Sequence, residues 1–100
     1  MGGIGIKLNY PIVKDWAFVA PEPIPSRLCG KVYGSEKFPD GTNVASSYIR
    51  RMIEEQGVII VETRNSKYII REDEVSKEHE EKMGNIWQRL IVKIKLDRFR

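Results

Sequence analysis

Cysteine and histidine are almost absent from this chain of 100 residues, which has one of each, Cys29 and His79. A disulfide within the chain needs two cysteines, so none is expected, and this scarcity is usual in the reducing cytosol. A structural zinc site takes four nitrogen or sulfur ligands, and a catalytic one usually takes three protein ligands. The sequence therefore predicts no bound metal and no cofactor. We expect Cys29 to be a buried small apolar residue and His79, between Glu78 and Glu80, to be a solvated helix residue.

Long apolar runs and phosphate-binding loops are also missing. No stretch approaches the roughly 18 apolar residues of a membrane-spanning helix. Residues 1–6 carry neither the basic start and apolar core of a signal peptide nor the Ser or Thr of a myristoylation motif. The glycines of residues 2–5 lack the preceding strand of a dinucleotide fingerprint, and no Walker pattern is present. The sequence therefore predicts a cytoplasmic protein without a membrane segment.

A catalytic set is equally difficult to assemble. Nucleophilic catalysis needs a Ser or Cys beside a general base that a third group orients. His79 is the one histidine, and nothing in the sequence places Ser46 or Ser47 beside it. We therefore expect a binding protein rather than an enzyme, with a weak hydrolase as one alternative.

The amino-acid composition is that of one globular domain. Hydrophobic residues make up 41% and charged residues 31% of the chain, which is typical of a folded protein rather than a disordered one. A domain of this size buries about 60–70% of the surface of its unfolded chain, so oligomerisation is a natural way to cover leftover apolar surface. The net charge of +3 permits an anionic partner without requiring one.

Residues 14–71 indicate a small, mostly antiparallel β-sheet. Runs of β-branched and aromatic residues predict strands over residues 16–20, 27–33, 42–47, 58–63 and 67–71. Asp40-Gly41 predicts a turn, and Gly30 within a strand predicts a bulge or a close backbone approach. The prolines of residues 21–25 predict an extended connector. Residues 48–56 fit a helix or a strand equally well.

Apolar residues recur at three- and four-residue steps after Val75, which predicts one amphipathic helix over residues 75–96. Ser76 is its candidate N-cap, and Gly84 weakens the helix by about 1 kcal/mol relative to Ala. The predicted fold class is α+β, with this C-terminal helix packed across the sheet. The single domain spans residues 1–100 and consists of an irregular N-terminal segment with one strand (1–26), a β-hairpin core (27–71) and the helix.

Arginine, tyrosine and asparagine residues gather in the β-rich centre. A guanidinium group holds phosphate in a planar, bidentate grip, and a tyrosine ring offers a face on which a base can stack. Asparagine side chains can read the edge of a base. The candidate ligand-binding residues are Arg27, Asn43, Arg50, Arg64, Asn65, Tyr68 and Arg71. The alternative is that the arginines pair with neighbouring glutamates on an ordinary surface.

Several strand and turn motifs follow one another in order. They are Leu28-x-Gly30-x-Val32-x-Gly34, Phe38-x-Asp40-Gly41-Thr42, Ser46-Ser47-x-Ile49 and Val61-x-Thr63-x-x-Ser66-x-Tyr68-x-Ile70. This pattern resembles small β-domains encoded by phages and prophages. In size and style the chain is similar to viral sponges, including the Thoeris anti-defence sponges, which form oligomers and sequester nucleotide signals of bacterial immunity without cleaving them.

The resemblance implies an anti-defence phage protein that binds a small anionic, cyclic nucleotide as a homo-oligomer in the host cytosol. No ligand contact of that family is transferred to this chain, so the candidate residues rest on their own chemistry. Two other functions fit the same residues. A nucleic-acid-binding module would lose affinity steeply with salt, and an inhibitor of a host defence protein would have a protein partner and no small ligand.

Overall fold

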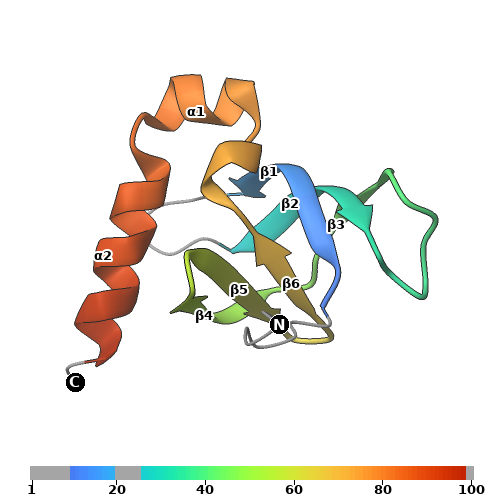
Figure 1. Ribbon diagram of the computed structural model, residues 1–100, viewed down its shortest axis with the longest axis horizontal. Coiled ribbons are helices and arrows are strands. Elements are labelled where there is room, and N and C mark those ends of the chain that lie inside the picture. Colours follow the sequence, from blue (N-terminus) through green and yellow to red (C-terminus); the bar gives the residue numbers. More distant parts are fainter. Residues whose placement is uncertain (1–9, 20–25, 99–100) are drawn as a thin grey trace, which may run out of the picture.

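The computed structural model describes residues 10–19 and 26–98, which fold into one six-stranded sheet followed by helices (Figure 1). The strands are β1 (Ile12–Val19), β2 (Arg27–Tyr33), β3 (Thr42–Ala45), β4 (Ile49–Glu55), β5 (Val58–Thr63) and β6 (Lys67–Ile70). A 3-10 turn, η1 (Glu72–Glu74), leads to the helices α1 (Lys77–Met83) and α2 (Ile86–Arg98). The predicted α+β class with a small, mostly antiparallel sheet is confirmed. The proline connector predicted over residues 21–25 lies outside the described residues.

The sheet has the strand order β3-β2-β1-β6-β5-β4. Strands β1 and β6 pair in parallel through Ile12 and Ile69, and the other neighbours pair antiparallel. The register of β1 against β2 shifts between Lys14 and Ala17, and Gly30 lies beside this irregularity. A Cβ atom on Gly30 would lie 2.5 Å from Cγ1 of Val13 and 2.7 Å from the carbonyl oxygen of Lys14. The predicted close backbone approach at Gly30 is therefore confirmed.

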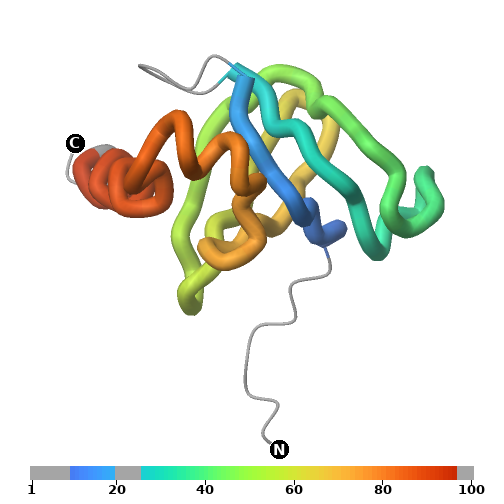
Figure 2. The backbone as a smooth tube through the Cα atoms, turned by 90° about the horizontal axis from the view of Figure 1, so that it is seen from above, coloured from blue at the N-terminus to red at the C-terminus, as the bar shows by residue number. Residues whose placement is uncertain are grey.

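The sheet curls where the chain passes from β3 to β4 (Figure 2). The Ser46 N–H donates to the Leu28 carbonyl and the Ile49 N–H donates to the Ser26 carbonyl, each at 2.8 Å. These two bonds hold Ser46 and Ile49 to the start of β2, whereas β4 pairs with β5. Residues 48–56, which fit a helix or a strand by sequence, are mainly strand, because β5 pairs antiparallel with residues 49–55.

Trp16 is the centre of the core. It is fully buried, and its ring centroid lies 5.4 Å from that of Phe18 and 6.1 Å from that of Trp87. Its indole Nε1 donates a 2.7 Å hydrogen bond to the carbonyl of Arg71. Helix α2 contributes Trp87, and also Leu90 on the next turn, to the same cluster. The core therefore joins β1 to α2 and to the chain that follows β6.

The prediction of one helix over residues 75–96 is wrong, because the segment forms two helices. Gly84 ends α1 with φ of 66°, which glycine adopts without a steric penalty, and its N–H donates to the Glu80 carbonyl. The break lets α2 turn along the side of the sheet (Figure 1), where Leu90 and Ile94 are buried. The predicted N-cap is confirmed, since the Ser76 hydroxyl accepts from the His79 N–H. None of the described helices is long and apolar enough to cross a membrane.

The expectation that His79 is solvated is also wrong. His79 is 8% exposed, and its ring lies 6.2 Å from that of Trp16 and 6.1 Å from that of Phe18, between centroids. Its Nε2 accepts a 3.4 Å hydrogen bond from the Phe18 N–H. The residue faces β1 because the Ser76 cap fixes the first turn of α1 against that strand. Cys29, expected to be buried, is only half-buried.

The neutral His79 ring makes folding stability depend on pH. Burial lowers the pKa of His79 from its ordinary value, and the Lys82 charge lowers it further. As the pH falls, the unfolded chain takes up this proton before the folded one, so His79 lowers the free energy of unfolding from about pH 7 downward until the folded pKa is passed. Urea unfolding between about pH 7.5 and about pH 5.5 measures this slope. The variant His79→Gln is expected to flatten it, and equal slopes in both proteins would contradict the assignment.

Candidate anion-binding site

The corner between β3 and β4 is held by serine hydroxyls. Ser46 is 5% exposed, and its Oγ accepts a 2.9 Å hydrogen bond from the Leu28 N–H and donates one of 2.7 Å to the Ser47 carbonyl. A small hydroxyl side chain is needed here because it must satisfy both groups within a buried bend. The Ser46 hydroxyl is therefore part of the scaffold that fixes Ser47 and Tyr48.

The turn between β5 and β6 is held in the same way and is bonded to the corner. The Thr63 hydroxyl donates to the Ser66 carbonyl at 2.9 Å and accepts from the Ser66 N–H at 3.0 Å. Between these two residues, the Arg64 N–H donates to the carbonyl of Tyr48 at 2.9 Å, and the Asn65 N–H donates to Oγ of Ser47 at 3.1 Å. The exposed residues Arg64 and Asn65 are thus fixed next to Tyr48 before any ligand arrives.

Of two further arginines, one contacts Tyr48 and the other follows it by two residues in the chain. The guanidinium carbon of Arg27 lies 4.5 Å from the centroid of the Tyr48 ring, a cation–π contact. Tyr48 is 57% exposed, so much of its side chain remains open to solvent beside this contact. Arg50 is exposed and occupies the irregular step in the register of β4 against β5. We refer to Arg27, Arg50, Arg64, Tyr48 and Asn65 as the arginine corner.

The arginine corner carries positive charge that the described residues do not neutralise. No carboxylate in the described part of the chain lies within ion-pair distance of Arg27, Arg50 or Arg64. By contrast, Nε of Arg51 lies 3.1 Å from Oε2 of Glu62, which Lys67 also approaches. The alternative of surface pairing with glutamates therefore holds for Arg51 and not for the corner.

A shallow groove of about 190 Å³ adjoins the corner. Ser47 and Asn65 border both features, and the aromatic side chains of Phe38 and Tyr68 line the groove. Phe38 is 41% exposed, whereas Tyr68 is half-buried and packs against the core. Pockets for whole small molecules usually measure about 300–1,000 Å³, so this groove suits one ring of a larger ligand.

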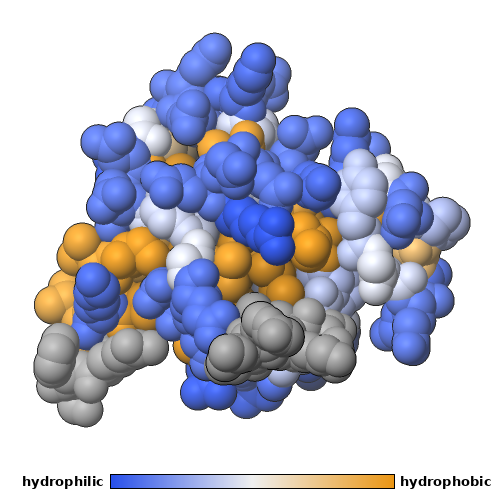
Figure 3. Space-filling view, viewed as in Figure 1, coloured by the Kyte–Doolittle hydropathy of each residue, from blue (hydrophilic) through white to orange (hydrophobic). Residues whose placement is uncertain are grey.

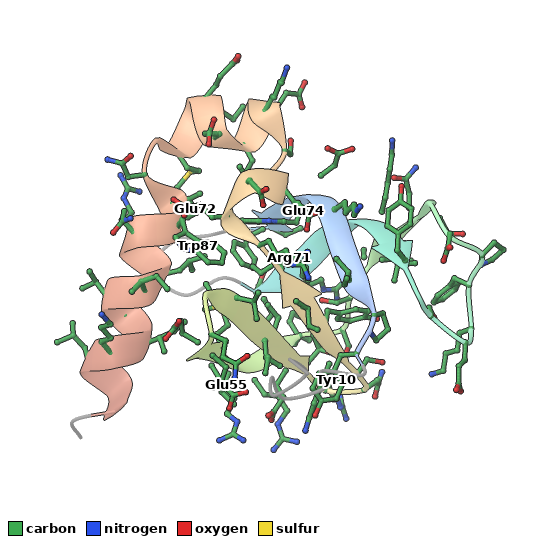
Figure 4. The ribbon with its side chains drawn as sticks, in the orientation of Figure 1. Tyr10, Glu55, Arg71, Glu72, Glu74 and Trp87 are labelled. Atoms are coloured by element: carbon green, nitrogen blue, oxygen red, sulfur yellow. The ribbon has the colours of Figure 1, made fainter. Side chains whose placement is uncertain are left out.

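Five of the seven candidate residues lie at the corner or its groove, and two do not. Contacts bring Arg27, Arg64, Asn65 and Tyr68 to this region, and Arg50 belongs to it through its place in the chain, two residues after Tyr48. Arg71 follows the opposite end of β6, five residues and about 17 Å along an extended chain from Ser66, beside η1 (Figure 4). Asn43 is exposed on β3 opposite Lys31 and does not line the groove. The expectation that all these side chains converge is therefore wrong for Arg71 and Asn43.

Ser47 was missed, and Tyr48 was considered as a stacking residue but was not among the candidate ligand-binding residues. The sequence placed residues 42–47 in a strand, whereas the strand ends at Ala45 and the two serines form the bend. The adjacency of Ser46 and Ser47 between two strand-like runs is the one feature of the sequence that indicates a corner. In the described part of the chain, no three His, Cys, Asp or Glu side chains gather as metal ligands.

Comparisons with known proteins identify no relative: no family model, no curated protein and no solved structure matches the chain.

Proposed function

We propose that the chain binds a small anionic nucleotide at the arginine corner and holds it without chemical conversion. The observation that carries this proposal is the placement of Arg27 and Arg64 at Tyr48, with no carboxylate of the described residues paired to them. Unpaired guanidinium groups on a fixed backbone offer charge-assisted, bidentate hydrogen bonds to phosphate. The mild excess of positive charge over the whole chain favours an anionic partner.

The proposed contacts follow the layout of the site. Arg27 and Arg64 hold phosphate oxygens from the two sides of Tyr48. A base enters the adjoining groove, where Tyr68 provides an aromatic wall and the Asn65 amide reads the edge of the base. The hydrogen bonds from Asn65 and Arg64 to the corner set this arrangement in advance, which reduces the ordering cost of binding.

The residues that hydrolysis would require have other roles, which supports binding without chemistry. The Ser46 hydroxyl is bonded within the corner, and the Ser47 hydroxyl accepts from Asn65. The one histidine, His79, packs against Trp16 and accepts from the backbone of β1. The weak hydrolase thus has less support than a binding protein.

Sequestration by an oligomer extends the same proposal. The groove is smaller than a nucleotide pocket, so a second copy of the chain completes the enclosure. Helix α2 exposes Val92 and Leu96, which are 55% and 63% exposed and lie four residues apart, and apolar surface is visible beside its lower half (Figure 3). The biological role that we propose is that of a cytoplasmic phage protein that removes a cyclic nucleotide signal of host defence.

The test is ligand capture followed by mass spectrometry. The full chain is incubated with a panel of cyclic and linear nucleotides, and the complex and the released ligand are both analysed. Intact nucleotide recovered after denaturation supports sequestration, and a cleaved product supports the hydrolase. Light scattering on the same samples reports whether the ligand is held by an oligomer. Failure to capture any nucleotide overturns the proposal and favours an inhibitor of a host protein.

The double variant Arg27→Ala/Arg64→Ala is expected to weaken capture at least about 100-fold. Each lost charge-assisted hydrogen bond is worth about 1.5–3 kcal/mol, and about 1.4 kcal/mol is tenfold in affinity. The matched control is Arg71→Ala/Lys77→Ala, which removes the same charge from exposed residues away from the corner. Calorimetric titration is expected to give the control the affinity of the unmodified chain. Equal losses in both variants would mean that net charge, and not the corner, governs binding.

A single-stranded nucleic acid is the second candidate, because Tyr48 is 57% exposed and lies beside Arg27 and Arg64 on an open corner. An extended strand contacts many phosphates, so its affinity falls steeply with salt, whereas a ligand with one or two phosphates shows a shallow slope. Titration over a range of salt concentrations separates the two.

A further inference from the structure

Strand β4 is the last strand at one side of the sheet, and its outer edge adjoins no other strand of the described chain. Residues 56–57 both have positive φ and form a two-residue hairpin turn, so Glu55 is the hydrogen-bonded residue of β4 that closes the turn. Bonded and non-bonded pairs alternate along an antiparallel ladder. Ile53 therefore bonds to β5, whereas the backbone groups of Met52 point away from β5, toward the open edge.

Helix α2 lies on one face of this strand and leaves the other face uncovered. Met52 packs against the core cluster, to which α2 contributes Leu90. Successive side chains of a strand point to opposite faces. Arg51, Ile53 and Glu55 therefore form a row on the face of β4 that is turned away from α2. We refer to these three residues as the β4 row.

The β4 row carries opposite charges at its two ends, with an apolar residue between them. Ile53 is half-buried, and Glu55 lies at the end of β4 (Figure 4). The Glu55 carboxylate makes no ion pair with another described residue. Arg51 contacts Glu62 through Nε, but its side chain is 65% exposed, and a guanidinium group has further N–H donors. Both ends of the row can therefore take a partner of opposite charge.

A second copy of the same strand is complementary to the β4 row when it runs antiparallel. In a two-fold arrangement with Ile53 beside the partner's Ile53, Arg51 of each copy lies opposite the partner's Glu55. Opposite charges across a strand pair stabilise it, whereas a parallel pairing in register would place Arg51 against the partner's Arg51. We propose that two copies of this chain associate edge to edge through β4 in this antiparallel register, which joins their sheets into one.

The association is measured on the full chain without nucleotide. Sedimentation velocity over a range of protein concentrations is expected to show a reversible equilibrium between monomer and dimer. Hydrogen exchange followed residue by residue with NMR locates the interface. The Met52 amide is expected to gain protection as the concentration rises, whereas the Ile53 amide, bonded to β5, is protected at every concentration. A chain that stays monomeric throughout, or a dimer in which the Met52 amide remains unprotected, overturns the proposal.

Charge reversal tests the register. Arg51→Glu and Glu55→Arg each place like charges opposite one another at both ends of the row, and each is expected to weaken association at least about tenfold. An equimolar mixture of the two variants restores an opposite-charge pair at both ends and is expected to dimerise again. Circular dichroism first shows that each variant is folded. A mixture that stays monomeric overturns the register.

The matched controls are Lys77→Glu and Glu81→Arg, which reverse the same two charges on exposed residues of α1. Both are expected to dimerise like the unmodified chain, and a weakening equal to that of the β4 variants would mean that net charge governs association. The interface uses neither Arg27 nor Arg64 of the arginine corner. Failure to capture a nucleotide would therefore leave this result unchanged, and a monomeric chain would not decide whether the corner binds nucleotide.

Discussion

Replacement of Trp16 by alanine is expected to reduce the free energy of unfolding by about 3–5 kcal/mol, the range found for large aromatic residues in cores. A domain of this length has about 5–15 kcal/mol in total, so the variant is expected to be close to unfolding. Trp16 is fully buried, contacts aromatic side chains from β1 and α2, and donates to the Arg71 carbonyl. Its loss therefore leaves a cavity and also an unpaired carbonyl at the end of β6. Urea unfolding measures the loss.

The variant Trp16→Phe separates these two contributions. Phenylalanine keeps most of the apolar contact but cannot donate to the Arg71 carbonyl, so we expect a loss of about 1–3 kcal/mol, the usual penalty for an unsatisfied buried group. A loss as large as that of Trp16→Ala would show that the hydrogen bond, and not packing, dominates. A loss near zero for both would mean that Trp16 is not the centre of the core.

Replacement of Gly30 by alanine is expected to cost about 3 kcal/mol, at the upper end for overpacking. The added Cβ would lie 2.7 Å from the Lys14 carbonyl oxygen, and backbone atoms cannot rotate away as a side chain can. The contact with Cγ1 of Val13, at 2.5 Å, is also within the core. The strands must separate to accommodate the methyl group, so thermal and urea unfolding are both expected to shift strongly.

Gly57→Ala is the matched control. Gly57 has φ of 83°, so alanine there carries a backbone penalty of about 1–2 kcal/mol, but no atom lies within 4 Å of its added Cβ. The difference between the two variants isolates the clash between β1 and β2. If Gly57→Ala is as destabilising as Gly30→Ala, the close approach at Gly30 is not the cause.

Much of the sheet could be predicted from local sequence because its strands are bounded by turn residues. The runs 27–33 and 58–63 have the predicted bounds, since β-branched residues fill the second run and the turn residues Gly34 and Gly57 adjoin the two. The break at Gly84 was not predicted, because the apolar spacing continues across it at helical intervals. Only the packing of α2 against the core decides that the helix must turn there.

The candidate site likewise has residues that could be predicted from the sequence and a grouping that could not. Residue chemistry alone selected Arg27, Arg64 and Asn65, because few side chains bind phosphate and read bases. Their grouping depends on a hydrogen bond between Asn65 and Ser47, which are 18 residues apart, and on the bend that follows β3. No local pattern distinguishes Arg64 in this turn from Arg71 at the far end of β6. That distinction requires the three-dimensional course of the chain.

The parallel pairing of Ile12 with Ile69 has a consequence for synthesis on the ribosome. The two residues are 69 − 12 = 57 positions apart, and β1 is the central link between the two antiparallel parts of the sheet. Translation proceeds at about 5–20 residues per second, so the nascent N-terminal hairpin waits several seconds for its second neighbour. During that interval one edge of β1 has no hydrogen-bond partner. Until β6 leaves the exit tunnel, this edge can pair with a strand of another nascent chain.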